Sequence, residues 1–503
     1  MKGNGILGSR GKRISGIGLA VWAVLTAPAW ATNGMNLEGY GPVAAAMGGA
    51  SLAYDNGTAA TMNNPATLAW SPAGVRLDLA LGLLGPRVDA VLVMPGAQRV
   101  AESQSRAFFM PAAGIFSKRG RLGFGLGLYA QGGMGTEYEG DSWLGDPSMD
   151  VNTALTEALV NRSEVSVGRA IAPVTFDVTP RLRLGGSVDF VWAGMDLQMA
   201  LSEGQFQDLA NPAAQTIGTA AGSLVQAFGG LYEPFGGTGI ERLHHAYFDF
   251  SNDSNFTGEA MGSGFAGKVG LTYAATPRLS LGAVYQSETA LGDLKTDQAS
   301  MSMGVSIDPG VLQGSPTGEY VDMILPLAGE IAVEDFQWPA TYGIGAAFRP
   351  TDRLVLVADV KRIAWSQVME DFEMTFTADA VPENGPFGGL AMDATLFQEW
   401  DDQTVFAGGA AYQMTPALTV RAGFNYGKNP VPAQFLNALF PAIVESHVTY
   451  GAGYAFHPRT RLDVSIMHGL DTADTNAGNG ATIPAVESTH SQTNAMVMVS
   501  HRW

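Results

Sequence analysis

The feature that most constrains this chain is a two-residue repeat of large apolar side chains in its regular segments. Over residues 122–128 leucine and phenylalanine alternate with glycine, and similar alternation occupies 182–192 and 418–426. Side chains two positions apart lie on one face of a β-strand, so each segment is predicted to be a strand with one apolar face and one small or polar face. Beyond residue 31, no uninterrupted apolar run reaches the roughly 18 residues that indicate a membrane-spanning helix.

Tight turns that lead into a leucine-led strand recur six times. They occupy 117–122, 179–182, 276–279, 349–354, 415–418 and 457–462, and five of the six contain proline. Proline suits such a turn because its fixed φ matches a corner position and needs no hydrogen-bond partner there. Between these turns the chain is far longer and its middle is polar or irregular, as in 198–245, 293–337 and 366–402. Short turns alternating with long loops are typical of outer-membrane barrels.

The turns also predict a strand number. If both ends of the chain lie on the periplasmic side, six turns join twelve strands and two more flank them, which predicts an all-β, 14-stranded antiparallel transmembrane β-barrel. The barrel must close because hydrocarbon offers an open sheet edge no hydrogen-bond partner. The strands are expected near 75–83, 106–116, 121–131, 163–178, 181–197, 261–275, 279–290, 338–349, 353–363, 403–414, 418–427, 446–456, 461–469 and 493–503. A soluble β-sandwich is the alternative, but loops this long are uncommon in compact soluble domains.

The first 31 residues are predicted to be an export signal. Four basic residues precede an apolar stretch over 14–27, and Ala29-Trp30-Ala31 supplies the small-x-small cleavage pattern. A membrane anchor is the alternative, although the apolar stretch is shorter than the roughly 20 residues that a spanning helix needs. The last strand ends on Trp503, an aromatic end that resembles the signal by which bacterial barrels reach the barrel assembly machinery. We therefore expect a protein of the outer membrane of a Gram-negative bacterium.

Residues 32–72 do not follow the strand pattern. They are rich in alanine, glycine and asparagine, and they precede the first strand. The stretch is too apolar for a solvated tail, and its small side chains permit close packing in a confined space. We therefore predict an N-terminal hatch, or plug, inside the lumen, with residues 73–503 forming the barrel and its long extracellular loops. The hatch candidates are Asp55, Asn63, Asn64, Pro65 and Ala66.

This N-terminal block resembles the hatch of the FadL family of outer-membrane transporters of long-chain fatty acids and other hydrophobic compounds. The resemblance rests on paired glycines and alanines, an aspartate, and Asn64-Pro65-Ala66 directly before the first strand. Two further stretches are similar to the family, 338–345 with Trp365-Ser366, and 421–426 with 429–432. The resemblance implies capture of the ligand between extracellular loops, binding in the barrel, movement of the hatch, and lateral exit near the third strand. Once inside the wall, such a ligand gains roughly 0.8 kcal/mol per buried CH2.

Apolar residues of two long loops are candidates to line the capture groove. They are Leu224, Phe228, Leu231, Tyr232 and Phe235 in one loop and Met301, Met303, Val311 and Leu312 in the other. Methionine adapts to varied ligands, but packing of the loops against each other explains the same residues equally well. Gly127, Gly132 and Gly133 are candidates for the lateral opening, because glycine in a strand often marks a bulge or bend. Ordinary loop glycine is the alternative.

Charged residues at lumen-facing positions form a separate group of candidates. By strand parity Arg76, Lys268, Lys361 and Arg421 face the lumen, among Asp78, Asp189, Asp359 and Asp463. Lys268 and Arg421 are candidate partners for the carboxylate of a fatty acid. Pairing of these cations with the aspartates is the alternative, and the sequence favours it.

A barrel-type lipid hydrolase and a general porin are the alternative functions. None of the seven histidines has a metal-ligand spacing such as H-E-x-x-H, and no G-x-S-x-G motif is present, so we predict no enzyme, catalytic residue, metal or cofactor. Porins have water-filled lumens and more strands, and they lack an apolar N-terminal plug. The expected partners are a hydrophobic ligand and membrane lipid. A net charge of -19 argues against nucleic acid. The choice among fatty acid, alkane and aromatic hydrocarbon stays open.

Overall fold

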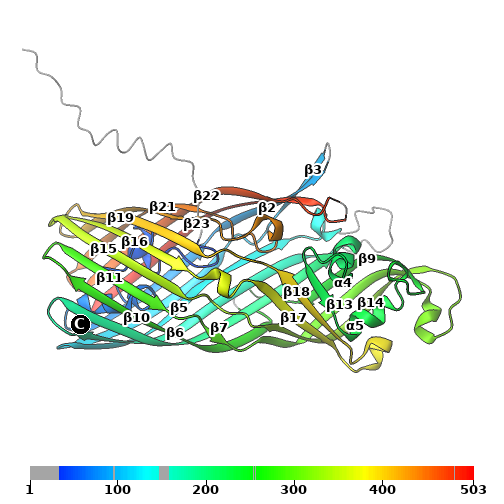
Figure 1. Ribbon diagram of the computed structural model, residues 1–503. Coiled ribbons are helices and arrows are strands. Elements are labelled where there is room, and N and C mark those ends of the chain that lie inside the picture. Colours follow the sequence, from blue (N-terminus) through cyan, green and yellow to red (C-terminus); the bar gives the residue numbers. More distant parts are fainter. Residues whose placement is uncertain (1–32, 95–96, 147–157, 253, 255–256, 481) are drawn as a thin grey trace, which may run out of the picture.

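The computed structural model describes residues 33–94, 97–146, 158–252, 254, 257–480 and 482–503, so the predicted export signal lies outside the described residues. The sheet curls into an elongated cylinder (Figure 1). It closes because β1 (Gly74–Leu84) pairs antiparallel with β23 (Ala485–Arg502) on one side and with β4 (Phe108–Arg119) on the other. The first and last long strands therefore complete the wall together, and no free edge remains at this seam.

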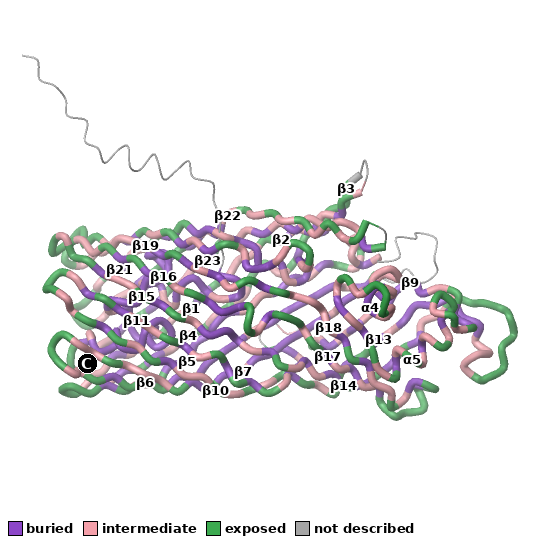
Figure 2. The backbone as a smooth tube through the Cα atoms, in the orientation of Figure 1, coloured by how far each residue is buried: buried purple, intermediate pink, exposed green. Residues whose placement is uncertain are grey.

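Antiparallel neighbours continue the wall from β4 to β23. In order they are β5 (Leu122–Tyr138), β6 (Asn161–Asp177), β7 (Leu182–Leu201), β10 (Ala260–Ala274), β11 (Leu279–Gln286), β15 (Thr341–Thr351), β16 (Leu354–Ile363), β19 (Gln403–Gln413), β20 (Leu418–Gly427), β21 (Ser446–His457) and β22 (Thr460–Asn476). Each predicted strand range overlaps one of these strands. The apolar face points outward, since Leu122, Phe124, Leu126 and Leu128 are each about half exposed. Figure 2 shows exposed and buried positions alternating along the wall.

The predicted count of 14 strands is wrong for the sheet as a whole, which has 23 strands in the described part of the chain. Segments predicted to be irregular also pair into strands. These are β2 (Pro86–Met94), β3 (Ala97–Glu102), β8 (Gly218–Ala221), β9 (Ile240–Phe250), β12 (Ala290–Leu291), β13 (Leu294–Ile307), β14 (Val321–Glu334), β17 (Asp371–Ala378) and β18 (Ala391–Phe397). The error has two reasons: β8 and β12 are only four and two residues long, and in other strands polar residues alternate with apolar ones. In β17, for example, Phe372, Met374 and Phe376 alternate with polar residues at period two.

Most of these additional strands extend the cylinder beyond one end. β9 pairs with β7 and β13, β13 with β14, β14 with β17, β17 with β18, and β18 with β8. Figure 1 shows this extended end opposite the end that holds the tight turns and the C-terminus. The loops that the sequence predicts to be long therefore form an ordered rim rather than irregular chain.

The helices are short. They are α2 (Pro42–Ala45), α3 (Ala60–Asn63), α4 (Glu203–Ala210) and α5 (Ser223–Gly229), with 3-10 turns η1 (Pro65–Trp70), η2 (Trp143–Gly145), η3 (Glu233–Phe235), η4 (Pro309–Gln313), η5 (Trp365–Gln367), η6 (Pro382–Phe387) and η7 (Ala433–Phe435). Helix α4 begins with a capping box, in which Ser202 and Gln205 each bond the other's backbone N–H. Among the described residues, no helix has the length and apolar character needed to cross a bilayer.

The N-terminal segment, residues 33–71, bonds to strands on several sides of the wall and lies within the cylinder (Figure 1). The N–H of Gly48 donates to Thr449 Oγ1 of β21 at 2.9 Å, and the N–H of Thr58 donates to Asp78 Oδ2 of β1 at 2.7 Å. Close approach requires glycine in the wall, because a Cβ on Gly423 of β20 would lie 2.2 Å from the carbonyl carbon of Met47. The segment is therefore fitted to the wall, and its role as a hatch stays a prediction.

Candidate functional site

The wall is interrupted between β4 and β5. Their pairing runs from Arg119 with Leu122 to Ala113 with Leu128 and stops there. Both strands extend past this point, β4 back to Phe108 and β5 on to Tyr138. On its other side β5 keeps its pairing with β6, with a register shift between Ala130 and Gly132. Such a bulge bends a strand and re-aims its side chains. The bend carries β5 away from β4. Residues 108–112 of β4 therefore have no ladder pairing with β5.

The beginning of the N-terminal segment takes the place of β4 beside this bend. Asn36 forms an isolated antiparallel bridge with Gly132, and the N–H of Gly133 donates to the carbonyl of Met35 at 3.2 Å. A Cβ on Gly132 would lie 2.2 Å from that carbonyl oxygen, so a side chain there would displace the segment. Of the glycines predicted to mark an opening, Gly132 and Gly133 lie at the interruption, whereas Gly127 still pairs with β4.

Three neighbouring cavities lie in series between the extended end of the cylinder and the interruption. The outer cavity has a volume of about 350 Å³, the inner cavity about 30 Å³, and the gap cavity, beside the interruption, about 270 Å³. The outer and inner cavities share four lining residues, which are Met199, Leu396, Gln398 and Asn437. The inner and gap cavities share Met35 and Val165. The inner cavity is thus a narrow neck between two larger spaces.

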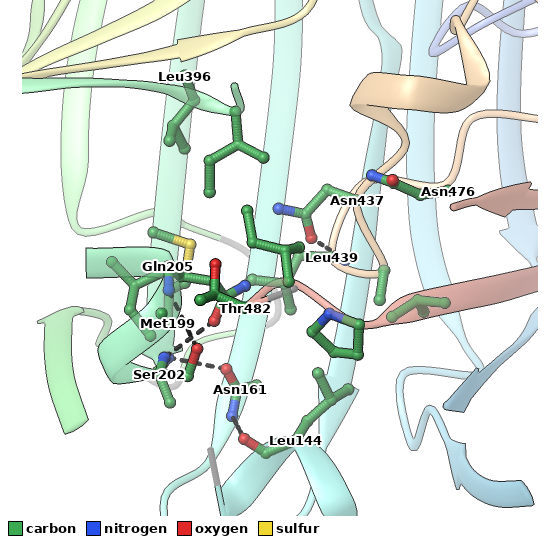
Figure 3. A pocket seen from close by; sticks show the side chains of 18 of the residues that line it. Leu144, Asn161, Met199, Ser202, Gln205, Leu396, Asn437, Leu439, Asn476 and Thr482 are labelled. Atoms are coloured by element: carbon green, nitrogen blue, oxygen red, sulfur yellow. Dashed lines mark hydrogen bonds between the residues drawn. The ribbon is translucent and has the colours of Figure 1, made fainter. Parts of the chain in front are cut away.

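Helix α4, β7 and two loops surround the outer cavity (Figure 3). Asn161 fixes one side of it by donating from Nδ2 to the carbonyl of Leu144 at 2.9 Å. On the other side, Asn437 Oδ1 accepts from the N–H of Leu439 at 2.9 Å, which leaves its amide nitrogen directed toward Leu396 (Figure 3). The space between is lined by apolar side chains such as Met199. This arrangement suits a small apolar ligand, held by shape and a few polar groups.

The predicted groove residues lie in two different surroundings at the extended end. Leu224, Phe228, Met301 and Met303 line a fourth apolar cavity of about 30 Å³, which shares Met199, Leu201 and Leu396 with the outer cavity. Tyr232 and Phe235 instead pack against Phe206 of α4. Leu231, Val311 and Leu312 also pack against the main apolar cluster.

Tyr232 is held by polar contacts as well as by packing. Its hydroxyl donates to Glu203 and accepts from Gln207 Nε2 at 2.9 Å. Burial, together with the Glu203 carboxylate, raises the pKa of Tyr232. These contacts agree with the packing alternative for this residue, and the ligand role of the whole group stays a prediction.

Three of the four predicted lumenal cations contact aspartates, and the fourth, Lys361, contacts a backbone carbonyl. Lys268 Nζ and Arg169 Nη1 both contact Asp189 Oδ2, the latter at 2.9 Å, and Arg421 Nη1 lies 2.9 Å from Asp463 Oδ1. Neither Lys268 nor Arg421 lines the outer, inner or gap cavity. Arg76 likewise pairs with Asp78, at 2.8 Å, and Lys361 Nζ donates to the carbonyl of Gly49 at 3.2 Å. These distances fit the pairing alternative, while a carboxylate-binding role for Lys268 and Arg421 gains no support from them.

The predicted hatch residues fasten the N-terminal segment. Asn64 Oδ1 accepts from the N–H of Ala66 and so caps η1, which begins at Pro65. The amide nitrogen of the same side chain donates to the carbonyls of Leu52, at 2.8 Å, and of Leu271 in β10, at 3.3 Å. Asn63 joins Tyr40 through two hydrogen bonds, and Asp55 lies 3.5 Å from Arg76 and 3.3 Å from Arg502. The Asn-Pro-Ala motif therefore both starts a turn and attaches the segment to the wall.

Sequence reasoning missed a buried ion pair between the segment and the wall. Glu38 Oε1 lies 2.6 Å from His447 Nε2 of β21, and Gln492 Nε2 donates to the same carboxylate oxygen at 3.1 Å. Burial raises the pKa of Glu38, but the charge and hydrogen bond of His447 and the bond from Gln492 outweigh it, so the pKa lies below its ordinary value. Glu38 is the single charged residue between positions 33 and 54, and that isolation was the available signal.

A serine, a histidine and an aspartate meet near the outer cavity without forming a catalytic triad. His244 Nε2 lies 3.1 Å from Ser306 Oγ and 3.2 Å from Asp322 Oδ1, and the serine hydroxyl donates to the same aspartate. In a triad the two ring nitrogens contact the serine and the aspartate separately, so that a proton can be taken from the hydroxyl. Here one nitrogen faces both groups and the hydroxyl is already directed at the carboxylate. The cluster therefore ties β9, β13 and β14 together.

Comparison with known proteins gives consistent matches. Residues 19–500 match a family described as outer membrane protein transport protein (OMPP1/FadL/TodX). The crystal structure of the toluene transporter TodX of P. putida is 30% identical, covers 93% of this chain and 99% of that chain, and has a TM-score of 0.74. The toluene transporter TbuX of Ralstonia pickettii is 30% identical with the same coverage and a TM-score of 0.70. An uncharacterized protein of Chlorobium limicola is 52% identical over 65 residues, which span 13% of this chain and 32% of that protein.

Proposed function

Because the chain belongs to the OMPP1/FadL/TodX family of outer-membrane transport proteins, we propose that it admits uncharged hydrophobic compounds through the three cavities and releases them sideways into the membrane. As a member of this family it is a Gram-negative outer-membrane protein and a transporter rather than an enzyme. In this proposal the extended end is extracellular, and the outer cavity captures the ligand. No energy source is needed, since burial of apolar surface favours entry at about 25 cal/mol per Å².

The absence of charge in the neck is the observation that carries the choice of ligand. Among the described residues lining the inner cavity there is no lysine, arginine, aspartate or glutamate. The gap cavity is lined by Glu38 and Glu164 and by no cationic lysine or arginine in the described chain. A fatty-acid carboxylate would lose its hydration in the neck without a compensating partner and would then approach two carboxyl groups. An uncharged compound meets neither obstacle, and the toluene transporters named above favour an aromatic ligand.

Release is proposed to depend on the first few described residues. Met35 lines both the inner and the gap cavity, and residues 35–36 occupy the interruption beside Gly132 and Gly133. Withdrawal of these residues would join the two cavities and leave a passage between Pro111 of β4 and Met134 of β5, which both line the gap cavity. The passage faces lipid because the neighbouring outward side chain, Phe109, is 53% exposed. A hatch movement confined to this short stretch suffices for lateral exit.

Filling the interruption tests the proposed route. Gly132→Trp places a bulky side chain in the gap cavity, and we expect uptake of radiolabelled toluene by cells expressing the variant to fall to the background of cells without the protein. Leu126→Trp is the matched control, because Leu126 lies on the same strand and is 58% exposed on the outer face. Heat-modifiable migration in gels confirms that both variants assemble. Unchanged uptake by an assembled Gly132→Trp barrel would rule out lateral release at this position.

A further inference from the structure

One tryptophan that lines the inner cavity has a buried hydrogen-bond donor without a partner in the described chain. Trp400 lines this cavity and is 2% exposed, and its Nε1 has no hydrogen-bond partner among the described residues. Buried polar groups are normally paired, and an unpaired donor lowers stability. Two other indoles are satisfied: Trp338 Nε1 donates to Asn36 Oδ1 at 2.7 Å, and Trp143 Nε1 donates to the carbonyl of Ala90 at 3.1 Å. Trp365 Nε1 is also buried without a partner in the described chain, but Trp365 does not line the inner cavity. The unpaired donor of Trp400 therefore calls for a functional explanation.

A second donor belongs to the same cavity. Asn437 lines both the outer and the inner cavity, and its Oδ1 is engaged by the N–H of Leu439. Its Nδ2 is directed across the cavity toward Leu396 (Figure 3). An amide nitrogen can only donate, as can an indole nitrogen. Trp400 and Asn437 thus bring two uncharged donor groups to a lining that is otherwise apolar apart from Gln398.

The chemistry of these donors defines what they would bind. A carbonyl or ether oxygen has two lone pairs and can accept from two N–H groups. A carboxylate would also accept, but it would be an unpaired charge in a cavity whose described lining has no cation. A plain hydrocarbon offers at most the face of a ring, which is a weak acceptor. The cavity is therefore matched to an apolar molecule that carries one uncharged oxygen.

We propose that Trp400 is a specificity-determining residue, which selects hydrophobic compounds bearing one uncharged oxygen acceptor, such as aryl ketones, over hydrocarbons of the same shape. This proposal rests on the transport function proposed above. The ring of Trp365, 5.2 Å from that of Trp400 at an interplanar angle of 61°, holds the indole in place. A fixed donor contributes more to selectivity than a mobile one, because little freedom is lost when the ligand binds.

A matched pair of ligands and a matched pair of variants test this proposal. Acetophenone and α-methylstyrene have nearly the same shape, and the first carries a carbonyl oxygen where the second carries a CH2 group. Dissociation constants are measured by isothermal titration calorimetry of the full protein in detergent micelles, with empty micelles as the blank. Trp400→Phe keeps an aromatic ring and removes the N–H. Trp70→Phe is the control, because its Nε1 is also buried and unpartnered in the described chain but Trp70 does not line the inner cavity.

For Trp400→Phe we expect acetophenone to bind about fivefold to tenfold more weakly, as for the loss of one hydrogen bond, while α-methylstyrene changes by less than about twofold. Trp70→Phe should leave both ligands within about twofold. Asn437→Asp keeps the oxygen that caps Leu439 and replaces the donor by an acceptor, so it should weaken acetophenone more than α-methylstyrene even if the tryptophan variant fails to assemble. Equal effects on the two ligands in both variants would overturn the proposal. Failure of the wild-type protein to bind either ligand would instead count against the proposed function.

Discussion

The two parts of the N-terminal segment meet the wall in different ways. The base, residues 40–71, is fastened to strands around the cylinder, for example by Asp359 Oδ2, which accepts from the N–H groups of Ser51 and Leu52 at 2.6 and 3.1 Å. The leading part, residues 33–38, lies between cavities and is held by a few contacts, chiefly to Gly132, Trp338 and His447. The segment is thus fixed to the wall over most of its length, and its leading part has fewer attachments than its base.

The largest effect is expected from a variant that displaces the base from the wall. At Gly423 an added Cβ would lie only 2.2 Å from the backbone of Met47, and the Gly423→Val side chain is larger still. We expect this overpacking to lower the free energy of unfolding by on the order of 3–4 kcal/mol. Planar-bilayer recordings should then show large steady currents through the emptied lumen. Gly408→Val is the control, since the nearest atom to its Cβ is 3.7 Å away. Silent bilayers with an assembled Gly423→Val barrel would show that the base does not seal the lumen.

A smaller effect is expected from Asn64→Ala, which removes the side chain that joins the base to β10 and caps η1. Several buried partners lose their hydrogen bonds, so the free energy of unfolding in lipid vesicles, measured with urea, should fall by about 2–3 kcal/mol. Asn36→Ala makes the same change in the leading part, where one bond to Trp338 is lost, and should cost about 1 kcal/mol. Equal losses would contradict the distinction between base and leading part.

Glu38→Gln tests the attachment of the leading part alone. Loss of the ion pair with His447 should weaken that attachment by about 1–2 kcal/mol, because the glutamine can still form hydrogen bonds at this position. Hydrogen exchange at pH 7, followed by mass spectrometry, should show faster exchange in 33–38 and unchanged exchange in 40–71. If exchange rises in both parts together, they do not move independently.

The smallest effect is a dependence on acid. The pKa of Glu38 lies below its ordinary value of 4.5. The carboxylate's contribution to the attachment of residues 33–38 is therefore fully present above that value and is lost as pH falls through the lowered pKa. Once corrected for intrinsic rates, exchange protection of 33–38 should be constant from pH 7 to about 5 and decline below about pH 4. In Glu38→Gln this decline should be absent. A decline of equal size in that variant would assign the titration to another group.

The wall strands could be predicted from the sequence because each long strand alternates an apolar side chain toward lipid with a small one toward the lumen, as at Leu126 and Gly127. The strands of the rim could not be predicted in the same way. In β17, for example, apolar residues alternate with polar ones, and such a composition is also typical of a loop. Gly132 and Gly133 could be found as glycines within a strand. Their contact with Met35 could not, because nothing local in either segment specifies the other.

The candidate site was predictable in part for the same reason. Strand parity places Lys268 and Arg421 in the lumen, but it does not say which aspartate each one meets. Trp400 gives no signal at all in the sequence, since its distinguishing property is an N–H group without a partner in the described fold. Sequence patterns report the environment of a side chain along its own strand. Contacts between distant segments depend on the closed geometry of the cylinder.

The interruption beside Gly132 also bears on how fast the proposed passage would open. Where β5 leaves β4, its neighbour is a short peptide joined by the Asn36 bridge and the Gly133 bond, rather than a full ladder. On the proposed route, opening would require a brief separation of that peptide and no separation of the surrounding strands. Motions of such segments occur in nanoseconds to microseconds, whereas local unfolding takes microseconds to seconds. Supply of ligand from outside, rather than the gate itself, should then set the rate of entry.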